Sequence, residues 1–169
     1  GNTYNLTAIK DARAAVGLHL LDSLAVSPHL HGARVLDVGT GAGLPGIPLA
    51  IVNEQRSFVL LDSSAKKIRF VRQVIMEMGL RNVEAVAMRV EAYQDPAGFD
   101  TVLARAFAGL TDIRAMTRRL LAPGGRILAL KGRVPLEEIR SLGPAAVQVH
   151  ALRVPGVDAE RHLIEVGAG

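Results

Sequence analysis

Short apolar stretches separated by turn-forming residues recur along the whole chain, and their spacing predicts its secondary structure. Runs that are apolar, or that alternate apolar and polar residues, predict strands at residues 35–38, 58–61, 83–87, 101–104, 126–130, 148–154 and 162–166. Apolar residues at helical spacing predict helices at residues 12–25, 47–52, 65–78, 110–121 and 135–142. Strands and helices therefore alternate along most of the chain.

This alternation is typical of α/β proteins, so we expect right-handed crossovers and a mostly parallel sheet. Turn residues should end two of the helices. Gly79 follows the helix at 65–78 as a C-terminal cap, and Pro123, Gly124 and Gly125 should stop the helix at 110–121.

A glycine-rich turn lies between the first predicted strand and the helix after it. Gly39, Gly41, Gly43 and Gly46 fall within eight residues. Glycine tolerates positive φ and has no Cβ, so a small ligand could approach the backbone N–H groups closely. Counted from Gly39, the sixth position is Leu44, so the pattern is GxGxG and not the GxGxxG of dinucleotide-binding proteins.

Asp62 closes the next apolar run, about 20 residues beyond the glycine-rich turn, where nucleotide-binding βαβ units carry a ribose-binding carboxylate. Turn and carboxylate together suggest a nucleoside cofactor. A purely structural interpretation stays open, in which the glycines form a tight corner and Asp62 caps the following helix.

Charged residues should gather where the predicted strands end, because α/β sheets bind ligands at the carboxyl ends of their parallel strands. Asp37, Asp62 and Glu91 are expected at this edge, and the fourth strand delivers Arg105 to it. The next strand ends at Lys131.

Composition limits the classes of function. At 169 residues the chain suits one domain with a sizeable core, and it contains no apolar run long enough to cross a membrane and no secretory signal. The absence of cysteine excludes disulfides, thiolate metal sites and a cysteine nucleophile, and fits a cytoplasmic enzyme. The net charge of +4 comes entirely from residues 101–169, which suggests a polyanionic partner or simply solvated arginines.

Three polar groups have both a functional and a structural interpretation. His19 and Asp22 lie three residues apart on one helix and could face a cleft, but no Ser or Cys nucleophile accompanies them. His29 and His31 lack the further ligands that a metal site needs. The basic face of the helix at 65–78 could contact nucleic acid, although such faces are more often solvated.

Seven sequence blocks together resemble a known family. They are residues 5–9 (NLTAI), 19–24 (HLLDSL), 37–48 (DVGTGAGLPGIP), 61–63 (LDS), 105–107 (RAF), 130–132 (LKG) and 160–163 (ERHL). In this order they are similar to the signature blocks of RsmG, the bacterial small-subunit rRNA guanine-N7 methyltransferases, also called glucose-inhibited division protein B. The blocks span nearly the whole chain. The family usually has an N-terminal helical extension, whereas this chain begins just before the first block.

The resemblance implies a class I S-adenosylmethionine-dependent methyltransferase fold, Rossmann-like, with a seven-stranded sheet, an antiparallel last strand and helices on both faces. It implies a single domain over residues 1–169, in which residues 1–30 form an N-terminal helical segment without the family's usual extension. The implied activity is methylation of guanine N7 at position 527 of 16S rRNA in the small ribosomal subunit. We expect a cytoplasmic monomer without metal or membrane contact.

The resemblance also implies site residues. Family contacts to S-adenosylmethionine carry over to Gly39, Leu44, Val90, Glu91 and Arg105, and the fold's ribose-binding carboxylate matches Asp62. Gly41 and Gly43 complete the cofactor loop. Candidates for contact with the RNA are Arg105, Phe107, Lys131 and Arg133.

Motifs that the sequence lacks restrict which atom of the base can accept the methyl group. Methylation of a pyrimidine carbon generally needs a cysteine, and methylation of an exocyclic amine typically uses an Asn/Asp-Pro-Pro-aromatic loop where this chain has Arg105, Ala106 and Phe107. Guanine N7 has a free lone pair and loses no proton, so no catalytic base is expected. Arg105 can hold O6, a phosphate or the cofactor carboxylate, but not the N7 lone pair that must react. The alternatives are methylation of another base position, a nucleotide-binding oxidoreductase, and a non-catalytic RNA-binding module.

Overall fold

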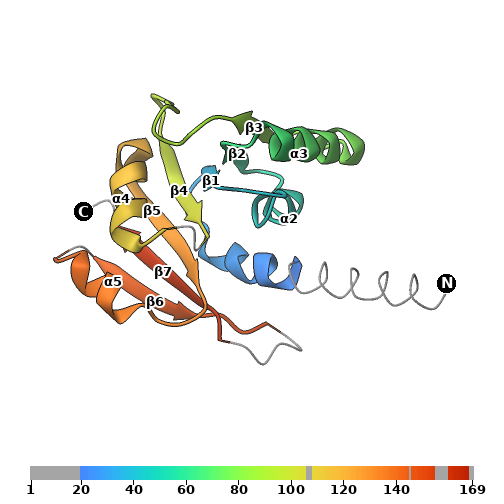
Figure 1. The fold of residues 1–169 in the computed structure, drawn as a ribbon. Coiled ribbons are helices and arrows are strands. Elements are labelled where there is room, and N and C mark those ends of the chain that lie inside the picture. The colour runs from blue at the N-terminus through green and yellow to red at the C-terminus, as the bar shows by residue number, and fades with distance from the viewer. Residues whose placement is uncertain (1–19, 106–107, 145, 155–159, 168–169) are drawn as a thin grey trace, which may run out of the picture.

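A single mixed sheet organises the computed structural model, which describes residues 20–105, 108–144, 146–154 and 160–167 (Figure 1). Within these residues the sheet has seven strands in the order β3-β2-β1-β4-β5-β7-β6. The strands are β1 (Arg34–Val38), β2 (Ser57–Asp62), β3 (Val83–Ala87), β4 (Phe99–Ala104), β5 (Leu121–Lys131), β6 (Val147–Ala151) and β7 (His162–Gly167). Strands β1 to β5 are parallel, and β7 runs antiparallel to both β5 and β6, as the resemblance predicted.

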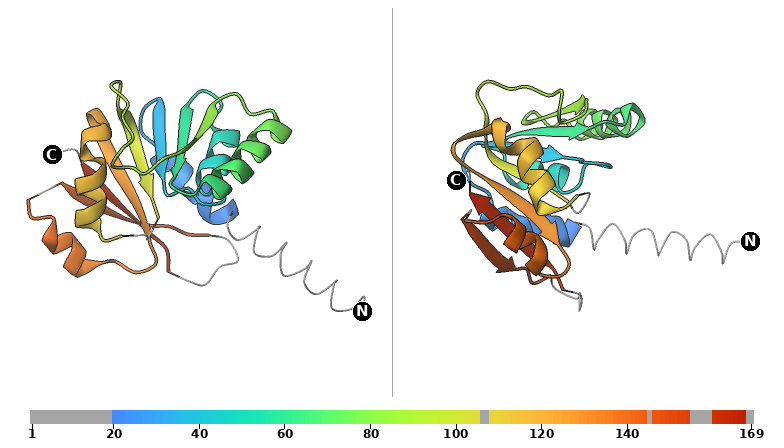
Figure 2. Two further views of the ribbon diagram at one scale, coloured as in Figure 1. Left: turned by 45° about the horizontal axis from the view of Figure 1, so that its top comes forward. Right: turned by 60° about the vertical axis from the view of Figure 1, so that its left-hand side comes forward.

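Helices cover both faces of this sheet. They are α2 (Gly46–Val52), α3 (Ala65–Met78), α4 (Leu110–Thr117) and α5 (Leu136–Ser141), with short 3-10 turns η1 (Ser27–His29) and η2 (Arg118–Leu120). Residues 20–26, directly before η1, are also helical. The two views in Figure 2 show α3 beside β2 and β3 at one end of the sheet, and α4 and α5 at the other end.

The core is divided between the two faces because successive side chains of a strand point to opposite sides. Leu36 and Val38 of β1 belong to one buried cluster, which is covered by α4 and α5. Val35 belongs to the other, which is covered by α2, α3 and the residues around η1. Strands buried on both faces are mostly apolar, which explains the continuous apolar runs at residues 58–61 of β2 and 102–104 of β4.

The order of the strands positions the ligand site. From β1 the chain adds β2 and then β3 on one side, and β4 returns to the other side of β1. At such a reversal the connections after neighbouring strands diverge, which opens a crevice at the carboxyl ends of the strands. The glycine-rich turn follows β1 and therefore lies at this crevice.

The predicted end of the helix at 110–121 is wrong. Helix α4 ends at Thr117, η2 follows, and β5 already begins at Leu121. Pro123, Gly124 and Gly125 therefore lie inside β5. Pairing of Leu121 with Phe99 of β4, followed by a shift in register, extends β5 through these residues, so contact between distant strands overrides the local turn signal.

None of the helices within the described ranges has both the length and the apolar character that a membrane crossing requires. The first part of the helix predicted at 12–25 lies outside the described residues, as do His19 and Phe107.

Candidate functional site

The turn after β1 requires glycine for its backbone. Gly39 and Gly41 have φ values of +70° and +59°, which side chains rarely tolerate. A Cβ built on Gly41 would meet no atom within 4 Å, so the space beside this residue is open. The loop thus presents bare backbone toward an empty volume.

Hydrogen bonds from the neighbouring strand hold this loop in place. The N–H groups of Gly39 and Thr40 donate to the carbonyl oxygen of Leu61, at 2.8 and 3.0 Å. The N–H of Gly41 donates to Oδ2 of Asp62 at 2.9 Å. The other oxygen, Oδ1, accepts from the N–H of Ser64 at 2.9 Å. Asp62 is therefore fixed at the end of β2, and its two oxygens keep lone pairs for further donors.

Asp37 supports the loop from inside the protein and does not reach the edge of the sheet. Its side chain is completely buried, and its Oδ2 accepts from Thr40 Oγ1 at 2.8 Å and from the N–H of Gly46 at 3.0 Å. Burial raises the pKa of Asp37 to about 7, against the opposing effect of these two hydrogen bonds and of the positive charge on Arg105. Asp37 thus joins the end of β1 to the start of α2.

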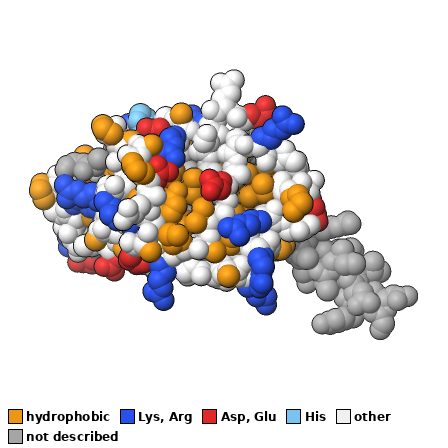
Figure 3. Space-filling view, turned by 90° about the horizontal axis from the view of Figure 1, so that it is seen from above, with side chains coloured by type: hydrophobic (Ala, Val, Ile, Leu, Met, Phe, Trp, Pro, Cys, Tyr) orange, Lys and Arg blue, Asp and Glu red, His pale blue; other side chains and the backbone are white. Residues whose placement is uncertain are grey.

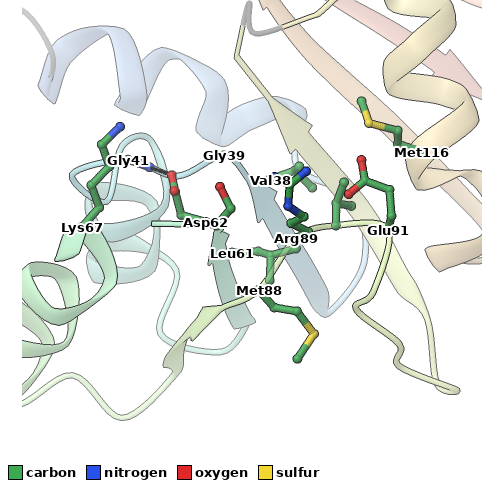
Figure 4. Close-up of a pocket in the computed structure, with 12 residues that line it drawn as sticks. Val38, Gly39, Gly41, Leu61, Asp62, Lys67, Met88, Arg89, Glu91 and Met116 are labelled. Atoms are coloured by element: carbon green, nitrogen blue, oxygen red, sulfur yellow. Dashed lines mark hydrogen bonds between the residues drawn. The ribbon is translucent and has the colours of Figure 1, made fainter. Parts of the chain in front are cut away.

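A cavity of about 430 Å³ lies in front of the loop (Figure 4). Its walls are formed by Val38, Gly39, Gly41, Leu61, Asp62, Ser63, Lys67, Met88, Arg89, Val90, Glu91 and Met116. Figure 4 shows Asp62 beside Gly41 on one side of this first cavity, and Glu91 with Met116 on the opposite side. The carboxyl ends of β1, β2 and β3 therefore meet around a single space.

Five of the predicted cofactor residues come together here: Gly39, Gly41, Asp62, Val90 and Glu91. Gly43 and Leu44 do not line the cavity. A Cβ on Gly43 would approach the Ile47 side chain to 2.5 Å, and the N–H of Leu44 donates to the carbonyl oxygen of Thr40 at 3.1 Å. These two residues shape the turn into α2.

A second cavity, of about 240 Å³, lies farther along the same edge of the sheet. It is lined by Asp22, Arg105, Leu130, Lys131, Gly132, Leu152, Arg161 and His162. Arg105 follows β4 and Lys131 ends β5, so this space adjoins the carboxyl ends of the strands on the other side of β1. The sequence placed Arg105 among both cofactor and RNA contacts, and the structure places it in this second cavity, together with Lys131.

The remaining RNA candidates lie elsewhere. Arg133 is exposed and lines neither cavity, and Phe107 falls outside the described residues. Figure 3 shows this edge of the molecule from above, with apolar side chains near the centre and basic side chains at separate positions around them. In this view the described residues form no single continuous basic patch.

The basic face of α3 serves more than one purpose. Arg72 donates from Nε and Nη2 to the carbonyl oxygen of Ala85, at 3.2 and 3.0 Å, and so fastens α3 to β3. Lys67 lines the first cavity, whereas Lys66 and Arg69 are exposed. Only part of this face is therefore free to meet nucleic acid.

Sequence reasoning missed several residues that line the first cavity. Met88 and Arg89 directly follow β3, so the rule that ligands bind at the carboxyl ends of strands could have found them. Met116 comes from α4, and only the packing of that helix on the sheet brings it to the cavity. In the described ranges no group of three or more His, Asp or Glu side chains is arranged to hold a metal ion.

A family model described as rRNA small subunit methyltransferase G matches residues 1–164. The chain belongs to this family. Curated relatives named ribosomal RNA small subunit methyltransferase G include one from Methylococcus capsulatus that is 61% identical over 96% of this chain and 80% of the relative. Another, from Aeromonas salmonicida, is 54% identical over 96% of this chain and 79% of the relative. The predicted resemblance to RsmG is confirmed, and with it the assignment as a methyltransferase.

Solved structures support the same fold. A SAM-dependent methyltransferase from Aquifex aeolicus superposes with a TM-score of 0.70 over 96% of this chain and 98% of that one, at 19% identity. The tRNA (m1A58) methyltransferase TrmI from Aquifex aeolicus gives a TM-score of 0.69 over 87% of this chain and 68% of that one, at 16% identity. The predicted Rossmann-like methyltransferase fold is confirmed, and the RsmG family and this fold together imply S-adenosylmethionine as cofactor.

Proposed function

We propose that this chain transfers the methyl group of S-adenosylmethionine to N7 of the guanine at position 527 of 16S rRNA in the small ribosomal subunit. The observation that carries the proposal is the first cavity, where the open glycine loop after β1 and the fixed carboxylate of Asp62 face the same space. Membership of the RsmG family supports the choice of substrate.

The residues of the first cavity fit the proposed cofactor. Its volume of about 430 Å³ lies within the range of roughly 300–1,000 Å³ that small-ligand sites occupy. Asp62 would accept from the ribose hydroxyls with its remaining lone pairs, and Glu91 from the exocyclic amine of adenine. Val90 and Met88 would supply apolar contact to the ring, and the loop at Gly41 leaves room for the methionine part.

The chemistry demands little of the side chains. When bound, S-adenosylmethionine supplies an electrophilic methyl group on a positively charged sulfur, which keeps the electron pair of the broken carbon–sulfur bond as N7 forms the new bond. N7 reacts through its own lone pair and has no proton to lose, so we assign no catalytic base. The protein's contribution is to align the guanine and the cofactor in a site that excludes water.

The RNA side of the site is proposed from charge and position. Arg105 and Lys131 line the second cavity beside the cofactor cavity, where they would face O6 or phosphate oxygens and leave N7 free. We keep Arg133 and Phe107 as candidates for RNA contact, from the family resemblance. We also propose that the chain acts as a monomer without metal.

The test is methyl transfer from labelled S-adenosylmethionine to 16S rRNA that lacks the modification, both naked and assembled into small subunits. We expect one 7-methylguanosine at position 527, identified by mass mapping of nuclease fragments. A methyl group on another atom or position would contradict the proposal and support the alternative methyltransferase activity.

Calorimetry separates the remaining alternatives. We expect S-adenosylmethionine to bind and NAD to give no measurable heat, since Leu44 occupies the sixth position of the dinucleotide pattern. Binding of NAD in its place would favour an oxidoreductase, and binding of rRNA without turnover would favour a non-catalytic RNA-binding module.

A further inference from the structure

The second cavity contains a carboxylate that the cofactor does not need. Asp22 lies in the helical segment at 20–26, and its side chain is only 12% exposed. Its Oδ2 accepts from Nε of Arg161 at 3.3 Å, across 139 residues of sequence. Its Oδ1 is shielded from water and has no hydrogen-bond partner in the described structure. A buried acceptor without a donor is costly, and no described residue supplies the hydrogen bond that this oxygen could still accept.

Two basic side chains that line the second cavity, Lys131 and Arg105, differ in how many of their donors are already used. Nζ of Lys131 is already engaged, because it donates to the carbonyl oxygen of Ala108 at 3.1 Å and pairs with Glu138 at 3.2 Å. Arg105, by contrast, makes no hydrogen bond or ion pair among the described residues, although its charge acts on buried Asp37. The cavity therefore offers unused acceptor capacity at Asp22 and unused donors at Arg105.

Guanine matches this distribution of donors and acceptors. Its Watson–Crick edge has two adjacent donors, N1–H and the exocyclic N2 amine, followed by the acceptor O6. Adenine, cytosine and uracil have no pair of adjacent donors on that edge. A carboxylate accepts at two oxygens, so it distinguishes guanine from the other bases. A base held by this edge keeps N7, on its opposite side, free to react.

We infer that Asp22 is a specificity-determining residue, whose carboxylate accepts from N1–H and N2 of a flipped-out guanine in the second cavity. Arg161 holds the carboxylate in position, and Arg105 faces O6. The cavity of about 240 Å³ is smaller than most sites for drug-sized ligands, which suits a single base. This inference rests on the proposed function and assigns its base-recognition step.

The experiment compares guanine with inosine at the target position. Inosine keeps N7 and O6 and lacks only the N2 amine. In 16S rRNA made by splinted ligation and assembled into subunits, replacing guanine by inosine should lower kcat/KM of the wild-type enzyme by roughly 10- to 100-fold. Asp22→Asn should be slow on both RNAs, with a guanine-to-inosine ratio below about threefold. Its affinity for S-adenosylmethionine should stay within about twofold, because Asp22 does not line the first cavity.

Glu165→Gln is the matched control. Glu165 is also a largely buried carboxylate, with 14% exposure, and it pairs with Arg126 at 3.3 Å and His150 at 3.2 Å, but it lines neither cavity. This variant should lose thermal stability and keep the wild-type guanine-to-inosine ratio. A purely structural role for Asp22 would give Asp22→Asn the same behaviour as this control, and the inference would be overturned.

The wild-type measurement alone can also overturn the inference, since it needs no variant to fold. Equal kcat/KM on guanine and inosine, with 7-methylguanosine still formed, would remove Asp22 from base recognition and leave the proposed function standing. Failure of the wild type to methylate guanine N7 on any form of the RNA would overturn both.

Discussion

The two cavities lie along one edge of the sheet, yet the chain assembles them in different ways. Most walls of the first come from residues directly after β1, β2 and β3, where each strand delivers its own short segment. The second joins Asp22 near the beginning of the described chain to Arg161 near its end, 139 residues apart. Local turns therefore build the cavity proposed for the cofactor, and the overall topology builds the cavity proposed for the base.

Replacing Asp62 by Ala should have the largest effect on the first cavity. The change removes the acceptor proposed for the ribose and also the hydrogen bonds that hold Gly41 and Ser64. We expect the Kd for S-adenosylmethionine, measured by calorimetry, to rise by about 100-fold or more, since hydrogen bonds to a charged group contribute about 1.5–3 kcal/mol each. Asp22→Asn serves as the control, and equal losses of affinity in both variants would show that the cavities are not separate sites.

Gly46→Ala should destabilise the packing of the start of α2 against β1 and β2, next to the glycine-rich turn. A Cβ at this position would come within 2.2 Å of Leu60 Cδ2 and 2.9 Å of Asp37 Oδ2, both in the core. We expect the free energy of unfolding in urea to fall by about 1–3 kcal/mol, the usual cost of overpacking. Gly124→Ala, where a Cβ would meet nothing within 4 Å but φ is +77°, should cost only the smaller backbone strain. Equal losses in the two variants would argue against tight packing at Gly46.

Asp37 should make stability depend on pH. Its folded-state pKa of about 7 is above the unfolded value of 3.8, so between these values the folded state binds a proton that the unfolded state has lost. The free energy of unfolding should therefore decrease as the pH rises from about 4 to 7, by at most about 1.4 kcal/mol for each pH unit, and level off above 7. Urea unfolding of the wild type and Asp37→Asn at pH 5 and pH 7 isolates this contribution, and a constant difference between them would contradict it.

The smallest expected effect concerns Glu137 and Glu138 of α5. Glu138 contacts Lys131, which lines the second cavity. Oε1 of Glu138 accepts from the N–H of Leu110 at 2.9 Å and from Lys131 at 3.2 Å. Glu138→Gln should lower the free energy of unfolding by about 1 kcal/mol, because a charged acceptor becomes neutral. Glu137→Gln removes only the exposed pair with Arg140 and should change stability by less than about 0.5 kcal/mol. Indistinguishable values for the two variants would mean that Glu138 does not hold α4 and Lys131 in place.

The same contrast explains what could be predicted from the sequence. The succession from β1 through the glycine turn to α2 depends on neighbouring residues, so the apolar pattern and the glycines were enough to locate it. Gly79 ends α3 with φ of +63°, as its position in the sequence predicted. The start of β5 was not predictable, because pairing with Phe99 decides it.

The same distinction, between features set by neighbouring residues and features set by distant contacts, applies to the site residues. Asp62 was predicted to bind the cofactor from its spacing to the turn, and Glu91 from the end of the third strand together with the family resemblance; both line the first cavity. Arg105 was predicted as a cofactor contact from the family resemblance and also as an RNA contact; the structure places it in the second cavity, and its role in cofactor binding stays a prediction. Asp22 was noticed as a partner of His19 and within the family block at residues 19–24, but nothing local reveals that Arg161 lies against it.

The strand β7, which lies between β5 and β6, is translated after the other strands of the described sheet, so the two cavities are completed at different times during synthesis. Every segment that surrounds the first cavity has been translated once residue 116 is made. The second cavity needs Arg161 and His162, which come with the final strand. An emerging polypeptide therefore acquires the parts of the cavity proposed for the methyl donor long before those of the cavity proposed for the guanine, and the two can act together only when β7 has entered the sheet.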